Sequence, residues 1–116
     1  MVIAGFGCRA GATVESFRSA LARTGARADG LAVPADRADA IAPFAEAEGL
    51  VVHAIAADAL ASIDTPTHST VSMDARGVGS VAEAVALAAA GKAARIIVAR
   101  VISSDRMATC AIAQGQ

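Results

Sequence analysis

The stretch Gly5-Phe6-Gly7-Cys8-Arg9-Ala10-Gly11-Ala12-Thr13 lies between a short apolar segment and an amphipathic one. Residues 2–4 predict a buried strand, whereas Val14, Phe17 and Leu21 recur at the spacing of one helix face. Glycine tolerates positive φ and permits close approach, and the first amides of a helix lack backbone partners. Such a turn attracts anions. The stretch therefore predicts a strand-to-helix turn that contacts an anionic ligand.

Strands and helices alternate along the rest of the chain, and glycines close the helices. Thr13 is the expected N-cap of the first helix, and Gly25 is its expected end. The second helix begins near residues 39–41 and stops at Gly49, so Pro43 must lie in its first turn unless the residues before it form a loop. The expected strands are residues 2–4, 31–34, 50–55, 95–102 and 107–113, and the expected helices are residues 13–24, 39–48 and 80–91, with a helical turn at 57–63 and either a strand or a helical turn at 70–73.

Short strands that alternate with helices are typical of an α/β sandwich, here in a single domain of residues 1–116. We expect a mostly parallel mixed sheet with helices packed on it and a C-terminal antiparallel hairpin as its edge. Residues 95–102 are β-branched and apolar, which favours a central strand. Ligands of such sheets bind at the carboxyl ends of strands, where residues 5–11 and the loop at 77–80 would lie. Two helix N-termini would then face one crevice.

The composition excludes several classes of function. The formal net charge is −1, acids and bases are mixed, and the only aromatic residues are three phenylalanines, so nucleic acid is not an expected partner. No apolar run approaches the roughly 20 residues that span a bilayer, and no secretion signal is visible. We therefore expect no membrane partner and a cytoplasmic protein. Cys8 and Cys110 form neither a disulfide framework nor a metal cluster, and we expect no cofactor.

The residues Ser80-Val81-Ala82-Glu83 match a capping box at the head of the longest helix. In such a box the glutamate side chain returns to the backbone of the capping serine. The spacing alone accounts for Glu83, which is interpreted as a helix cap and not as a catalytic acid.

Two segments together resemble a known family. Residues Gly5-Phe6-Gly7-Cys8-Arg9 and the segment 77–91 are similar to the CobE family of cobalamin-biosynthesis proteins, which is itself similar to the C-terminal domain of CbiG. The resemblance covers nearly the whole chain. The chain departs from the family in the loop before the longest helix, where only Ser69 represents the family's Asn-Pro-Ser and Thr67 and His68 take the other two places.

The resemblance implies a place in the construction of the corrin ring. CbiG-type proteins open the δ-lactone of a cobalt-containing precorrin and release acetaldehyde, whereas CobE-type proteins stand alone in the oxygen-dependent branch. The implied partner is a corrin-ring intermediate of the precorrin or hydrogenobyrinic acid type, which is a multivalent anion with an apolar plane. Other cobalamin-biosynthesis enzymes and a second copy of the chain are further candidate partners.

The implied ligand-binding residues come from the glycine turn, two later arginines and the loop before the longest helix. They are Gly5, Gly7, Cys8, Arg9, Gly11, Arg37, Ser69, Gly77, Ser80 and Arg100. The arginines, with Arg76, would bind carboxylates, and Phe6 or Met73 would meet the face of the macrocycle. His68, more than His53, is a candidate axial ligand of cobalt, although no metal is assigned to the protein itself.

Three functions stay open. The first is a non-catalytic corrinoid-binding protein, which the lack of a recognisable catalytic set favours. The second is hydrolysis of the lactone, with water activated by His68, Asp36 or Asp39. The third is a nucleotide-binding module, in which Asp29 or Asp36 would bind a ribose. Catalytic residues are therefore not assigned.

Overall fold

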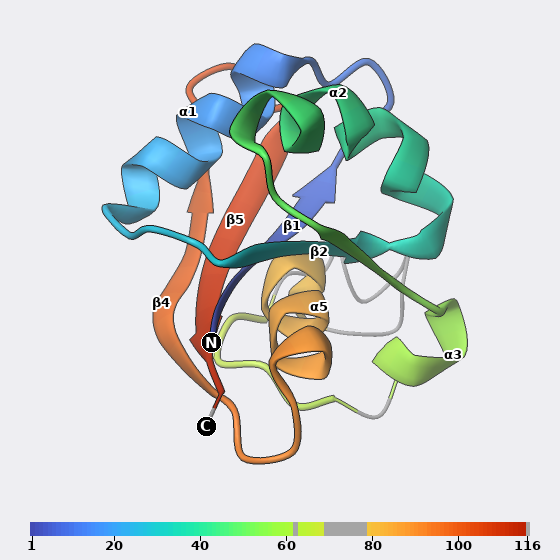
Figure 1. Ribbon diagram of the computed structural model, residues 1–116. Helices are drawn as coiled ribbons and strands as arrows, with labels where there is room; N and C mark the ends of the chain where they lie inside the picture. Colours follow the sequence, from blue (N-terminus) through green and yellow to red (C-terminus); the bar gives the residue numbers. More distant parts are fainter. Residues whose placement is uncertain (62, 69–78, 116) are drawn as a thin grey trace.

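Strands and helices alternate as predicted in a computed structural model that describes residues 1–61, 63–68 and 79–115 (Figure 1). The strands are β1 (Val2–Cys8), β2 (Gly30–Pro34), β3 (Val52–Ile55), β4 (Arg95–Ile102) and β5 (Ala108–Gln114). The helices are α1 (Val14–Thr24), α2 (Ala38–Glu48), α3 (Ala57–Leu60) and α5 (Val81–Ala90), with a 3-10 helix at Ala35–Arg37. The prediction for residues 70–73 lies outside the described residues.

The described strands form one sheet in the order β3-β2-β1-β5-β4. Strands β1, β2 and β3 run parallel, and β5 pairs antiparallel with both β1 and β4. The predicted mixed sheet with a C-terminal antiparallel hairpin is confirmed. The prediction that residues 95–102 form a central strand is wrong, because β5 pairs with β1 from Val2 to Cys8 and takes the inner place. As an edge strand, β4 tolerates two register shifts and the exposed Ile97.

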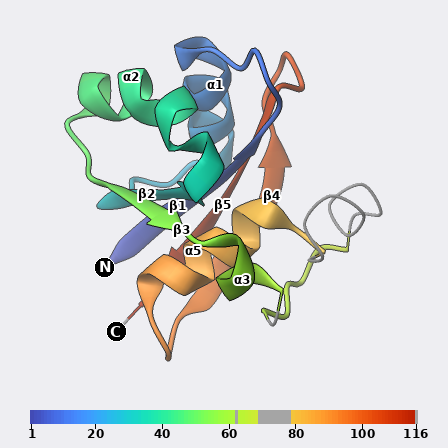
Figure 2. The same cartoon turned by 90° about the vertical axis from the view of Figure 1, so that its right-hand side faces the viewer.

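Helices cover both faces of the sheet (Figure 2). On one face, α1 and α2 enclose a core in which the rings of Phe6, Phe17 and Phe44 lie 5.6 to 5.9 Å apart between centroids. On the other face, the alanine-rich α5 packs with Leu60 of α3 and Ile3 of β1. Each fully buried phenylalanine contributes about 1.5–3 kcal/mol through removal of its apolar surface from water.

The glycines of the N-terminal stretch belong mostly to a strand. We predicted that Gly5 and Gly7 lie in the turn, but β1 continues to Cys8 and the turn is confined to the residues after it. A Cβ on Gly5 would clash with the carbonyl oxygen of Ala82 and lie 2.7 Å from the Cβ of Ala86. Gly5 therefore allows α5 to pack close to the sheet. A glycine inside a strand often marks such a close approach of another backbone.

The predicted helix ends are confirmed, but Pro43 lies deeper in α2 than predicted. Thr13 caps α1 with its side chain, and Gly25 and Gly49 end α1 and α2 in left-handed conformations, with φ of 70° and 68°. Because α2 begins at Ala38, Pro43 is its sixth residue and lies beyond the first turn. The missing proline N–H would have paired with the carbonyl of the fourth residue before it, which lies on the exposed start of the helix where water can bind it.

Candidate functional site

The ends of β1, β2 and β4 meet at one end of the sheet, here called the carboxyl edge. Cys8 pairs with Ala108 and Ile102 with Thr109, so β1 and β4 finish level with each other on either side of β5. Strand β2 runs parallel to β1 and finishes at the same end. An arginine lies within three residues of each of these ends. The three are Arg9, Arg37 and Arg100.

These arginines are not paired with acids in the described part of the chain. Its one ion pair joins Arg18 and Glu15 on the exposed side of α1. No described carboxylate lies within 4.0 Å of the guanidinium nitrogens of Arg9, Arg37 or Arg100. The Nε of Arg37 is also buried and has no hydrogen-bond partner, an arrangement that costs about 1–3 kcal/mol. Among the described residues, the carboxyl edge therefore offers cations without an acidic partner to an anionic ligand.

Asp105 ties the first turn of α1 to the β4–β5 hairpin. Its carboxylate accepts hydrogen bonds from Ser16 Oγ at 2.6 Å, Ser103 Oγ at 2.6 Å and Met107 N at 3.1 Å. The bonds from Ser103 and then Ser16 lower the pKa of Asp105. Arg9 N donates to Met107 O at 2.9 Å in the same region. Asp105 is not among the residues predicted from the sequence, although aspartate in a turn is a recognised signal for such local bonds.

The start of α1 is occupied by groups of the protein itself. Thr13 Oγ1 accepts from Ser16 N at 3.4 Å, and Thr13 N donates to Ser16 Oγ at 3.0 Å. This reciprocal cap satisfies donors that we expected a ligand anion to use. Helices α1 and α5 pack on opposite faces of the sheet (Figure 2). The expectation that their N-termini face one crevice stays a prediction.

The carboxylate of Glu83 does not close the predicted capping box. The first half of the box is confirmed, since Ser80 Oγ accepts from Glu83 N at 3.3 Å. The Glu83 side chain is 0% exposed and accepts hydrogen bonds instead from Thr67 N at 2.8 Å, Thr67 Oγ1 at 2.7 Å and Arg100 N at 2.8 Å. Ser80 itself is buried, and its hydroxyl serves the cap.

The segment 65–68 packs tightly against the residue before the cap of α5. A Cβ on Gly79 would lie 2.5 Å from Thr67 O, 2.8 Å from Thr65 Oγ1 and 2.9 Å from His68 Nδ1. Only glycine fits this close approach. His68 is exposed at this position, so its imidazole stands at the surface beside the start of α5.

Other candidate residues occupy a range of environments. Cys8 is half-buried at the end of β1, while Cys110 is buried and this burial raises the pKa of its thiol. Phe6 cannot meet a macrocycle as suggested, because its ring is fully buried in the aromatic core. His53 is half-buried, with Nε2 3.3 Å from the position of a Cβ on Gly30, as expected for a packed histidine.

Four of the predicted ligand contacts cannot be placed, and metal-ligating residues do not cluster where the structure can be described. Ser69, Met73, Arg76 and Gly77 lie outside the described residues. Among residues 1–61, 63–68 and 79–115, no three His, Cys, Asp or Glu side chains gather closely enough to hold a metal ion.

The structure removes two features on which the nucleotide hypothesis depends. Asp29 lies at the opposite end of the sheet, where its Oδ2 accepts from Val2 N at 2.7 Å. Gly5 and Gly7 lie in a strand instead of forming a phosphate-binding turn. The Asp29 carboxylate therefore lies away from the carboxyl edge, and Gly5 and Gly7 do not form a phosphate-binding loop there.

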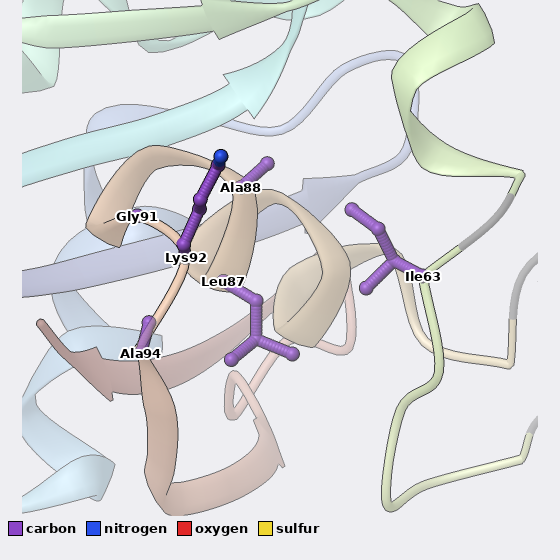
Figure 3. A pocket seen from close by; sticks show the side chains of 6 residues that line it. All are labelled: Ile63, Leu87, Ala88, Gly91, Lys92 and Ala94. Atoms are coloured by element: carbon purple, nitrogen blue, oxygen red, sulfur yellow. The ribbon is translucent and has the colours of Figure 1, made fainter.

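An open hollow of about 440 Å³ lies at the other end of α5 (Figure 3). Its lining is mostly apolar and comes from Ile63, from the end of α5 and from the turn that follows. Those residues are Ile63, Leu87, Ala88, Gly91, Lys92 and Ala94. Since α5 begins at the carboxyl edge, this hollow is separate from the predicted site.

A family model described as the cobalamin synthesis G C-terminus matches residues 2–113 of this chain. The chain belongs to the CbiG C-terminal family. The predicted resemblance to CobE and CbiG is thereby confirmed, and this CbiG C-terminal domain is a protein of the cobalamin biosynthesis pathway. No curated protein sequence matches the chain significantly.

Three solved structures share the fold of this chain. CobE, a protein from the cobalamin biosynthetic pathway, is 32% identical with a TM-score of 0.86, and the match covers 100% of this chain and 91% of CobE. Cobalamin biosynthesis protein ChiG from Agrobacterium tumefaciens strain C58 is 31% identical with a TM-score of 0.74, and 100% and 99% are covered. A cobalamin biosynthesis protein G homolog from Sulfolobus solfataricus, 17% identical with a TM-score of 0.75, shares the fold over 99% of this chain and 37% of its own.

Proposed function

We propose that this protein binds a corrin-ring intermediate of cobalamin biosynthesis at the carboxyl edge and does not convert it. The observation that carries the proposal is the set of three arginines, Arg9, Arg37 and Arg100, that lack a described acidic partner at one end of the sheet. Corrin intermediates carry several acetate and propionate groups. Guanidinium groups bind carboxylates through paired, charge-assisted hydrogen bonds, so several separated arginines suit such a ring.

A second candidate function is hydrolysis of the ring lactone. Exposed His68 beside the start of α5 favours it, because a neutral imidazole can activate water. Glu83 does not support this reaction, since both of its oxygens already accept hydrogen bonds from the protein. We therefore propose binding as the main function and treat acetaldehyde release as the sign of the alternative.

The test is a titration of the purified protein with hydrogenobyrinic acid, followed by absorbance. We expect a spectral shift at saturation, and we expect Arg9→Ala to weaken binding by about 1.5–3 kcal/mol, which is roughly 10-fold or more in Kd. Arg23→Ala is the matched control, since Arg23 lies in the last turn of α1, at the other end of that helix. Equal affinities of wild type and Arg9→Ala would contradict the proposed site.

The same samples distinguish the alternatives. Stoichiometric conversion of a lactone-bearing precorrin, with release of acetaldehyde, would contradict the binding proposal and support the hydrolase. Tight NAD(P) binding with no corrin binding would favour a nucleotide module.

Several expectations about cellular context stay predictions. None of the helices in the described ranges has the length and apolar character to cross a bilayer. The cytoplasmic location, association with other cobalamin-biosynthesis enzymes and self-association are proposals that need their own measurements.

A further inference from the structure

We infer that Glu83 is a positioning residue that holds the segment 65–68 and the part of β4 around Arg100 in one arrangement for a carboxylate-bearing ligand. This inference rests on the proposed function. It deepens that function by naming the group that sets the geometry of the carboxyl edge.

The Glu83 carboxylate is buried and satisfied by neutral donors. Oε1 accepts from Thr67 N, while Oε2 accepts from both Thr67 Oγ1 and Arg100 N. In the described part of the chain, no arginine or lysine lies within 4.0 Å of it. Glu83 is the third residue of α5, where the positive end of the helix dipole favours a negative charge. Among the described residues, the Glu83 side chain is thus held by hydrogen bonds and not by an ion pair.

The bond to Arg100 lies at an irregularity in β4. Between Val98 and Val101 the strand advances three residues, whereas its partner β5 advances two, from Ile112 to Cys110. One extra residue is therefore present in β4, as in a β-bulge, and a bulge frees an amide from the ladder and re-aims the neighbouring side chain. Because Glu83 accepts that amide at Arg100, its carboxylate stabilises the bulge.

The bonds to Thr67 fix the segment before α5. The segment also holds itself, since Thr65 Oγ1 donates to Thr67 O at 2.9 Å and Gly79 leaves the space for it. Glu83 adds the connection between this segment and the sheet edge. One side chain therefore sets the positions of exposed His68 and of Arg100 relative to each other.

A glutamine cannot replace this carboxylate. If its oxygen takes the Oε1 position, its NH2 group faces Arg100 N–H; if the amide is turned over, the NH2 group faces Thr67 N–H. Either orientation puts two donors against each other. Glu83→Gln should therefore break one of the two backbone contacts, unlike a glutamate in a simple capping box, where glutamine is an equivalent residue.

The experiment combines hydrogen exchange of the ligand-free protein with hydrogenobyrinic acid titration. The variants are Glu83→Gln and Thr67→Val, which removes one hydroxyl donor and nearly preserves shape. Val85→Ala is the matched control, because it removes buried methyl groups from the inner face of α5 without touching the Glu83 contacts. We expect Glu83→Gln to lose exchange protection at Thr67 or Arg100 and both test variants to bind at least 5-fold more weakly, while Val85→Ala loses thermal stability but keeps its affinity.

The outcomes separate this inference from the proposed function. Wild type that does not bind the corrin overturns the proposed function and, with it, the inference. Wild type that binds, with Thr67→Val and a folded Glu83→Gln binding equally well, overturns the inference alone. Weakened binding by Val85→Ala in proportion to its loss of stability also overturns it, because Glu83 would then act only through stability. If Glu83→Gln fails to fold, Thr67→Val decides.

Discussion

Ser16 Oγ donates a 2.6 Å hydrogen bond to Asp105 across 89 residues of sequence. The bond joins the first turn of α1 to the loop between β4 and β5, and the same carboxylate also holds Ser103 and Met107. The turn that carries Arg9 is bonded to this loop through Met107 O. A change at Asp105 should therefore affect the position of the first predicted ligand-binding arginine as well as stability.

Asp105 should make stability depend on pH in the acid range. Its pKa lies below the ordinary value of 3.8 because Ser103, Ser16 and the Met107 amide donate to its ionised form. A depressed folded-state pKa adds stability above the unfolded pKa, and that stability is lost as the pH falls through the folded value. We expect Asp105→Asn to lower the Tm at pH 7, and the difference from wild type to shrink below about pH 4. A difference that is constant from pH 7 to 3 would contradict this role.

Gly5→Ala should destabilise the protein. The added Cβ meets the backbone carbonyl of Ala82 and the Cβ of Ala86, neither of which is the end of a flexible side chain. We expect a loss of about 1–3 kcal/mol or more in the free energy of unfolding, measured in urea. Gly30→Ala on the neighbouring strand is the control, since its Cβ would meet Ile3 Cδ1 at 3.2 Å and His53 Nε2 at 3.3 Å, which can move. Equal losses for both variants would show that close helix approach is not the cause.

Arg37→Met should separate stability from ligand binding. The Nε of Arg37 is buried without a partner in the ligand-free protein, so its removal should leave the Tm unchanged or raise it. The same change should weaken corrin binding roughly 10-fold, because a charge-assisted contact to a carboxylate is lost. Thermal unfolding with and without hydrogenobyrinic acid measures both effects. A lower Tm together with unchanged affinity would assign Arg37 a structural role instead.

Phe6→Leu should act on the core and not on the ligand. Phe6 is fully buried between Phe17 and Phe44, at centroid distances of 5.6 and 5.9 Å. Loss of the ring contacts should lower the free energy of unfolding by about 1 kcal/mol. Corrin affinity, measured well below the Tm, should equal that of wild type. A selective loss of affinity would return Phe6 to the site.

Features set by contacts between near neighbours in sequence could be predicted. Thr13 as a cap and Gly25 and Gly49 as helix ends depend on hydrogen bonds and backbone angles within a few residues. The alternation of strands and helices follows from local apolar periodicity in the same way. The family resemblance adds the arginines, which the structure places within three residues of the ends of β1, β2 and β4.

The pattern by itself determined the elements and their ends, because those depend on interactions over one or two turns of chain. Only the tertiary structure decided that β5 lies between β1 and β4, that Gly5 is a packing site for α5, and that Glu83 bonds to Thr67 and Arg100 rather than to its own cap. These contacts join residues 16 or more positions apart. A buried carboxylate takes whichever donors the fold brings to it, and local spacing does not specify those donors.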